Sequence, residues 1–141
     1  KLENDLKKYV SSKKLNDSIL FLGKIYDENI LNLWFAIAKI FIIPTCIGLS
    51  AHHAFSYSKP IITDDSLINQ ASEADILVDG INCLLYKEGD LEDFALKIIQ
   101  LTNNKKLYDF ISHNAFLTVS QFFTLEKKVA NFKKSIYETL G

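Results

Sequence analysis

The residues best suited to hold a ligand lie in the segment Thr45-Cys-Ile-Gly-Leu-Ser50, directly after an apolar run that ends in Pro44. Gly48 lets the backbone approach a bound group closely. Ser50 stands where a helix is expected to begin, and the unpaired N–H groups of a helix start can hold a phosphate without arginine. The pattern alone therefore indicates a nucleotide or phosphate ligand as one option, beside a simple turn at Gly48 and a helix cap at Ser50.

The histidines and cysteines give a weaker indication of chemistry. His52 and His53 are neighbours, and adjacent helical residues do not share a face, so they form a poor chelating pair. Cys46 and Cys83 are the only cysteines and stand in no metal-binding or disulfide spacing. We therefore expect no metal site, and a reduced, cytoplasmic setting.

Strands and helices alternate along the chain that carries these residues. Short apolar runs predict buried strands at residues 18–23, 40–44, 59–63 and 82–86. Amphipathic spacing predicts helices at residues 1–10, 30–38, 51–57, 91–101, 105–123 and 124–140, and one helical turn around 67–71. Asp27 and Asp90 are the expected caps of two of these helices. The order predicts one α/β domain over residues 1–141, with a Rossmann-like parallel sheet, helices on both of its faces and a helical C-terminal tail.

Ligands of such sheets bind beyond the carboxyl ends of the strands. Three of these ends carry polar or flexible residues: Gly23-Lys24-Ile25, Pro44–Ser50 and Thr63-Asp64-Asp65. The middle segment is the most suggestive for an anion. The two aspartates are expected to cap the loop that follows them.

The composition excludes several classes of protein. The net charge of −1 gives no basic field for nucleic acid, and no apolar run reaches the length of a membrane span. Lysine pairs at 105/106, 127/128 and 133/134 are expected on solvated helix faces, with contact to a membrane surface left open. The 141 residues contain no methionine and begin at Lys1, so we expect a piece of a longer polypeptide.

A series of motifs follows in a characteristic order. It consists of Phe21-Leu22-Gly23, Leu33–Ala38, Ile40–Thr45, Gly48-Leu49, Ala54-Phe55-Ser56, Lys59–Thr63, Asp75-Ile76, Asp79-Gly80-Ile81-Asn82-Cys83-Leu84-Leu85 and Gly89-Asp90. From Ile19 to Asp90 the chain thereby resembles the C-terminal, donor-binding half of GT-B glycosyltransferases, specifically the retaining family 4, or group 1.

This resemblance implies transfer of a hexose-type sugar from a nucleotide-diphosphate donor to a saccharide or lipid-linked acceptor, with retention, in polysaccharide or glycolipid synthesis. It implies a donor site made of Gly23, Lys24 and Ile25 at the base, Gly48, Leu49 and Ser50 at the diphosphate, Thr45 near the sugar, and His53 near the ribose. The family's basic catalytic pair and its acceptor domain would lie upstream of residue 1, so this piece alone is expected to be inactive. No metal or other cofactor is expected.

Two departures from the family pattern keep alternatives open. Thr45 and His53 stand where the family has a pair of glutamates eight positions apart. Their hydroxyl and imidazole groups can bind a sugar hydroxyl, but neither is a fixed anionic acceptor. A nucleotide-binding or scaffold module that has lost its chemistry is therefore an alternative. A nucleotide-sugar epimerase and a doubly wound signalling domain are two others.

Overall fold

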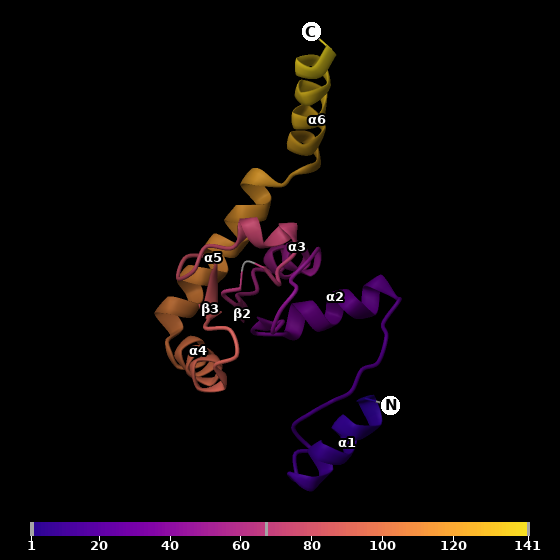
Figure 1. Ribbon diagram of the computed structural model, residues 1–141, viewed down its shortest axis with the longest axis vertical. Coiled ribbons are helices and arrows are strands. Elements are labelled where there is room, and N and C mark those ends of the chain that lie inside the picture. The colour runs from indigo at the N-terminus through magenta and orange to yellow at the C-terminus, as the bar shows by residue number, and fades with distance from the viewer. Residues whose placement is uncertain (1, 67, 141) are drawn as a thin grey trace. The chain divides into compact units, whose positions relative to one another are not determined.

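The computed structural model describes residues 2–66 and 68–140 (Figure 1). The chain divides into two compact units, Lys1–Asn32 and Leu33–Gly141, and we describe each by itself. The boundary falls within a helix. The expectation of one domain over residues 1–141 stays a prediction.

The first unit begins with helix α1, Leu2–Ser12, where a helix was expected. Glu3 and Lys7 form an ion pair of 2.6 Å one turn apart, and Val10 is the buried residue of the helix. The strand predicted at 18–23 is wrong, because this segment has no regular structure. A strand needs a partner for its backbone groups, and the described residues of this unit contain no other strand. Leu20 is consequently 69% exposed.

Helix α2, Glu28–Ile37, starts in the first unit and ends in the second. The Asp27 carboxylate accepts a hydrogen bond of 2.8 Å from the Asn29 N–H group, so the predicted cap is confirmed. The helix ends just before the first strand, which places Phe35 in the interior of the second unit.

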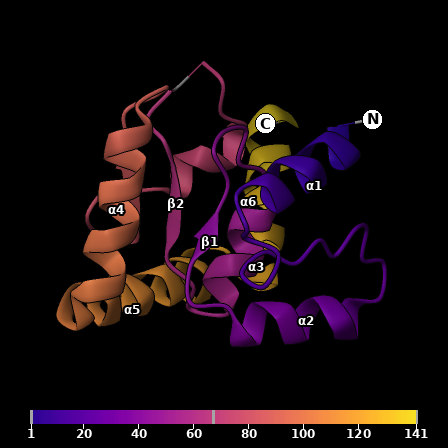
Figure 2. The same cartoon turned by 90° about the horizontal axis from the view of Figure 1, so that it is seen from below.

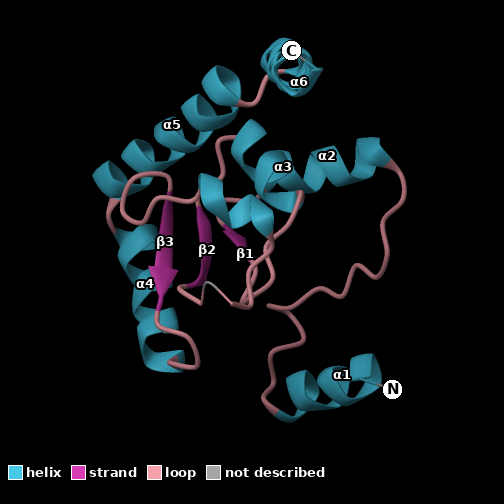
Figure 3. Cartoon of the chain, turned by 45° about the horizontal axis from the view of Figure 1, so that its top comes forward, coloured by secondary structure: helices cyan, strands magenta, loops and turns pink. Residues whose placement is uncertain are grey.

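The second unit contains a three-stranded parallel sheet in the order β1-β2-β3 (Figure 3). The strands are β1, Phe41–Ile42, β2, Ile61–Asp64, and β3, Cys83–Tyr86. Three of the four predicted strands are thus confirmed, with β1 shorter than expected. In register, Ile61 lies opposite both Phe41 and Cys83. Every residue of β2 is buried, as expected for the central strand of a parallel sheet.

Helices connect and cover these strands. Helix α3, Ser50–Ser56, joins β1 to β2 and packs against β2, while α4, Leu91–Asn103, follows β3 and packs against it. Figure 2 shows α3 and α4 on opposite sides of β1 and β2. The link from β2 to β3 holds a short 3-10 helix, η1, at Ser72–Ile76, whereas the helical turn was expected around 67–71. Of that range, residue 67 lies outside the described residues, and the described part contains turn and bend residues but no helix. This arrangement confirms the predicted Rossmann-like α/β fold.

Two further helices complete the unit and confirm the helical tail. Helix α5, Lys105–Phe122, packs against both α3 and α4, and α6, Leu125–Leu140, follows it. The hydrophobic core joins strands and helices: Ile62, Leu84, Tyr86, Leu101 and Ile111 are its buried members. This core holds β2 and β3 in place, and polar loops follow the carboxyl ends of both strands.

Candidate functional site

The carboxyl ends of all three strands surround an open pocket of about 510 Å³. Its lining comes from the loop after β1, the end of β2 and the segment that follows β3. The residues are Pro44, Thr45, Cys46, Asp64, Asn69, Tyr86, Glu88 and Gly89. Because ligands of parallel sheets bind at this edge, the pocket is the candidate functional site.

The loop from β1 to α3 is anchored to the other two strands through Pro44. The Pro44 carbonyl accepts hydrogen bonds from the Tyr86 hydroxyl at 2.9 Å and from the Asp64 N–H group at 3.3 Å. Burial, followed by the carboxylates of Asp64 and Glu88, raises the pKa of Tyr86. The Tyr86 hydroxyl therefore stays protonated and keeps its hydrogen bond to the Pro44 carbonyl.

The turn of this loop lies at Cys46 rather than at Gly48. Cys46 has φ +56, in the left-handed region that residues with a side chain rarely adopt. Gly48 has no such φ, and a Cβ placed on it would meet nothing within 4 Å. Gly48 therefore leaves open space beside its backbone and is not required by the backbone conformation of the turn.

Gln70 holds the loop from the other side. Its Oε1 atom accepts a hydrogen bond of 2.8 Å from the Ile47 N–H group. Its Nε2 atom donates to Asp64 Oδ1 at 2.7 Å and to Thr63 Oγ1 at 3.0 Å. Asp64 also accepts from the Ser66 N–H group at 3.2 Å, which confirms its expected role in capping the following loop.

The start of α3 offers unused donors. The helix begins at Ser50, and Leu49 caps it without a side-chain hydrogen bond, so Ser50 is a helical residue rather than the cap. Within the residues that the structure describes, the N–H groups of Gly48, Leu49 and Ser50 donate no hydrogen bond to the protein. The family resemblance implies these three groups as donors to the diphosphate, and that role stays a prediction.

The predicted site residues are only partly brought together. Thr45 lines the pocket, and the segment Gly48–Ser50 continues the same loop. His53 is exposed and does not line the pocket; its ring stacks on Phe35 with centroids 6.0 Å apart. Gly23, Lys24 and Ile25 belong to the first unit, so their part in this site stays a prediction.

Sequence reasoning overlooked four residues of the site: Asn69, Gln70, Tyr86 and Glu88. The Asn69 side-chain amide donates to the Glu88 carboxylate, which ties the loop after β2 to the segment after β3. Asp65 adds to this tie by accepting from the Glu88 N–H group at 2.9 Å. The only signal in the sequence was the position of Tyr86 and Glu88 near the end of a predicted strand.

The side chains of the pocket carry negative charge. Asp64 and Glu88 line it, and no lysine does so among the described residues. Carboxylates accept hydrogen bonds from hydroxyl groups but repel phosphate. An anionic group would therefore bind at the backbone donors near α3, and a polyhydroxylated group would bind at the carboxylates.

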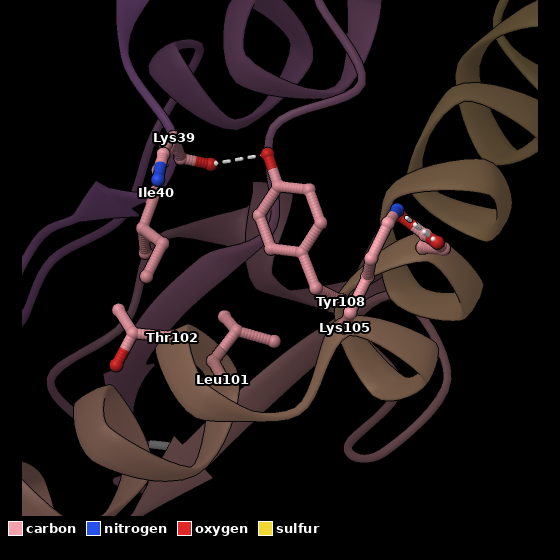
Figure 4. A pocket seen from close by; sticks show the side chains of 7 residues that line it. Lys39, Ile40, Leu101, Thr102, Lys105 and Tyr108 are labelled. Atoms are coloured by element: carbon pink, nitrogen blue, oxygen red, sulfur yellow. Dashed lines mark hydrogen bonds and ion pairs between the residues drawn. The ribbon is translucent and has the colours of Figure 1, made fainter.

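A second pocket lies at the opposite, amino end of β1 and has a volume of about 320 Å³ (Figure 4). Several of its polar groups are engaged within the protein. The Tyr108 hydroxyl donates to the Lys39 carbonyl at 3.0 Å, and Lys105 pairs with Asp109 at 2.7 Å. We assign the functional site to the carboxyl edge because ligands of parallel sheets bind there and because the N–H groups of Gly48, Leu49 and Ser50 beside it donate no hydrogen bond within the described residues.

Two observations concern metals and membranes. Among residues 2–66 and 68–140, no three histidine, cysteine or acidic side chains come together as metal ligands would. Over the same residues, no helix combines the length and the apolar character needed to cross a bilayer.

Comparison with solved structures identifies the class of fold. The C-terminal domain of a glycosyl transferase group 1 family protein from Francisella tularensis has a TM-score of 0.75 at 23% identity, over 88% of this chain and 63% of that one. HepE of Anabaena, solved in complex with UDP, has a TM-score of 0.73 at 21% identity, over 97% of this chain and 36% of that one. The fold is therefore that of the C-terminal domain of GT-B glycosyltransferases.

The family itself is shown by sequence. Residues 1–104 match the model of the family described as glycosyl transferases group 1, so the chain belongs to this family. An uncharacterised glycosyltransferase of Methanocaldococcus jannaschii is 27% identical over 144 residues. That match covers 100% of this chain and 39% of the relative, so the chain spans about two fifths of its length.

Proposed function

We propose that this chain is the nucleotide-diphosphate-sugar-binding half of a glycosyltransferase. The whole enzyme would move a hexose-type sugar, with retention, to a saccharide or lipid-linked acceptor in polysaccharide or glycolipid synthesis. The observation that carries the proposal is the family match over residues 1–104, which includes all three strands around the pocket. The complex of HepE with UDP supports a nucleotide as the ligand.

In this proposal two kinds of protein group bind the donor: backbone N–H groups of the loop after β1, and side-chain oxygen atoms of the pocket. The diphosphate would bind the free N–H groups of Gly48, Leu49 and Ser50, and the sugar hydroxyls would face Thr45 and the neighbouring carboxylates. The exposed imidazole of His53 can hydrogen-bond a ribose hydroxyl. Gly23, Lys24 and Ile25 would contact the base.

Catalysis requires positively charged groups that stabilise the negative charge of the departing diphosphate. Since no lysine lines the pocket among the described residues, we propose that the basic pair and the acceptor site come from a second domain. This chain alone would then bind the donor without transferring it, and neither a metal nor another cofactor would take part. We also propose a cytoplasmic location, with the exposed Lys133 and Lys134 of α6 available for contact with an anionic membrane face.

A module that binds nucleotide but has lost transfer is the second candidate. The specific observation in its favour is that Thr45 and His53 replace the family's two glutamates. In addition, the His53 ring packs on Phe35 instead of lining the pocket. The two candidates differ in activity and agree on nucleotide binding.

The proposal is tested by titrating the chain with UDP, GDP and ADP while recording its backbone amide signals by NMR. We expect one nucleotide to shift the signals of Gly48–His53 and of Gly23–Ile25. His53→Ala should weaken that binding, while His113→Ala, which changes an exposed histidine of α5, should leave it unchanged.

The outcomes separate the candidates. Binding together with sugar transfer by the full-length protein supports the glycosyltransferase. Binding by the full-length protein without hydrolysis or transfer of any nucleotide sugar supports the lapsed module. No amide shift at millimolar nucleotide, in either this chain or the full-length protein, would contradict the donor site.

A further inference from the structure

The Gln70 side chain hydrogen-bonds to three residues at the carboxyl edge of the sheet. Its one planar amide group reaches the loop after β1 through Ile47 and the end of β2 through Thr63 and Asp64. Nε2 also lies 3.2 Å from the Asp64 carbonyl. A single side chain thereby links the loop after β1 to the end of β2, and it lies 23 positions after Ile47 along the chain.

The chemistry of the partners calls for an amide. The Ile47 N–H group needs an acceptor, whereas Thr63 Oγ1 and the two Asp64 oxygens act as acceptors toward Gln70. Glutamine provides one carbonyl oxygen and two N–H donors on one group. Ile47 and Thr63 are fully buried and Asp64 is 4% exposed, so water cannot easily replace a lost partner.

The bond to Ile47 controls the shape of the pocket wall. Thr45 and Cys46, which line the pocket, directly precede Ile47. Cys46 adopts a left-handed conformation that a residue with a side chain disfavours, so the loop needs an external contact to keep it. Asp64, the other partner of Gln70, lines the same pocket.

We propose that Gln70 is a positioning residue of this site, which fixes the loop from Pro44 to Gly48 against the end of β2 and thereby sets the ligand-binding shape of the pocket. Gln70 itself does not line the pocket, so it acts through Ile47 and Asp64. Only the identity of the ligand, a nucleoside diphosphate, rests on the proposed function.

The first arm of the test needs no ligand. Hydrogen exchange of the Ile47 amide is compared in the wild-type chain, Gln70→Ala, Gln70→Glu and the control Gln100→Ala, which removes an exposed glutamine of α4. We expect exchange to be roughly tenfold faster in Gln70→Ala, since the Ile47 amide loses the acceptor that Gln70 Oε1 provides. Unchanged exchange would overturn the proposal.

Gln70→Glu adds a readout that a purely space-filling role would not show. The new carboxylate can still accept a hydrogen bond from the Ile47 N–H group. It has no hydrogen to donate to Asp64, so the two carboxylates should repel each other. Protonation restores a donor, so the defect in loop order should lessen as the pH falls toward the ordinary glutamate pKa of about 4.3. A defect that does not depend on pH would contradict the proposed network.

The second arm measures UDP affinity. We expect Gln70→Ala to weaken it by roughly tenfold and Gln100→Ala to leave it unchanged. Faster Ile47 exchange with wild-type affinity would overturn the positioning role. If the wild-type chain binds no UDP, the proposed function fails, while the exchange arm still decides the role of Gln70.

A third variant covers the case in which Gln70→Ala does not fold. Thr63→Val keeps the side-chain shape and removes one of the hydrogen bonds from Gln70 Nε2. It should raise Ile47 exchange by a smaller factor than Gln70→Ala is expected to. Exchange and UDP affinity both equal to wild type would then count against the network.

Discussion

At the scale of single residues, the two cysteines lie in opposite environments. Cys46 is exposed on the loop after β1, and Cys83 is fully buried at the start of β3. Burial, with a smaller effect of the Asp79 carboxylate, raises the pKa of the Cys83 thiol to about 12. Since the thiolate is the reactive form, Cys83 should be inert in the folded protein.

We therefore predict that one thiol per chain reacts rapidly with Ellman's reagent at about pH 8 and that the other reacts only after unfolding. Cys46→Ser should remove the rapid phase, and Cys83→Ser should leave it intact. Absorbance of the released thiolate gives both counts. Two rapid thiols in the native chain would contradict the burial of Cys83.

At the scale of elements, helix α4 shows how far local signals reach. Asp90 was expected to cap it, and the structure confirms this: its carboxylate accepts from the N–H groups of Glu92 at 3.1 Å and Asp93 at 3.0 Å. Such a cap depends only on residues within one turn of the helix start, so it can be predicted from the sequence.

Asp90→Ala should lower the free energy of unfolding by about 1 kcal/mol, because two N–H groups at the start of α4 lose their acceptor. Urea denaturation followed by circular dichroism measures the change. The matched control is Asp75→Ala, since Asp75 is exposed and its side chain makes no hydrogen bond within the described residues. Equal losses for both variants would show that the cap contributes nothing specific.

At the scale of the whole molecule, the core depends on residues distant in sequence. Leu101 of α4 is fully buried together with Ile62 of β2 and Ile111 of α5. Leu96 lies on the same helix but is 61% exposed. The same residue type on one helix thus has two different energetic roles.

Leu101→Ala should cost about 2–5 kcal/mol, because it removes buried methyl groups and leaves a cavity. Leu96→Ala should change stability by less than about 0.5 kcal/mol, as is usual for exposed sites. Thermal and urea unfolding of the second unit measure both. If the two variants lose similar stability, Leu101 is not part of a packed core.

The sequence alone determined the alternation of elements, the caps at Asp27 and Asp90 and the loop that bears Thr45 and Gly48. These features depend on local spacing, on the turn chemistry of single residues and on motifs that keep their order. The family resemblance drawn from those motifs is confirmed by the match over residues 1–104.

Only the tertiary structure decided which of these residues meet. It left the apolar segment 18–23 without a strand partner and turned His53 onto Phe35, because both outcomes depend on packing against distant residues. It also brought Gln70 to Ile47 and Tyr86 to Pro44. Contacts between residues 23 and 42 positions apart leave no periodic signal in a sequence, so the shape of the pocket could be learned only from the fold.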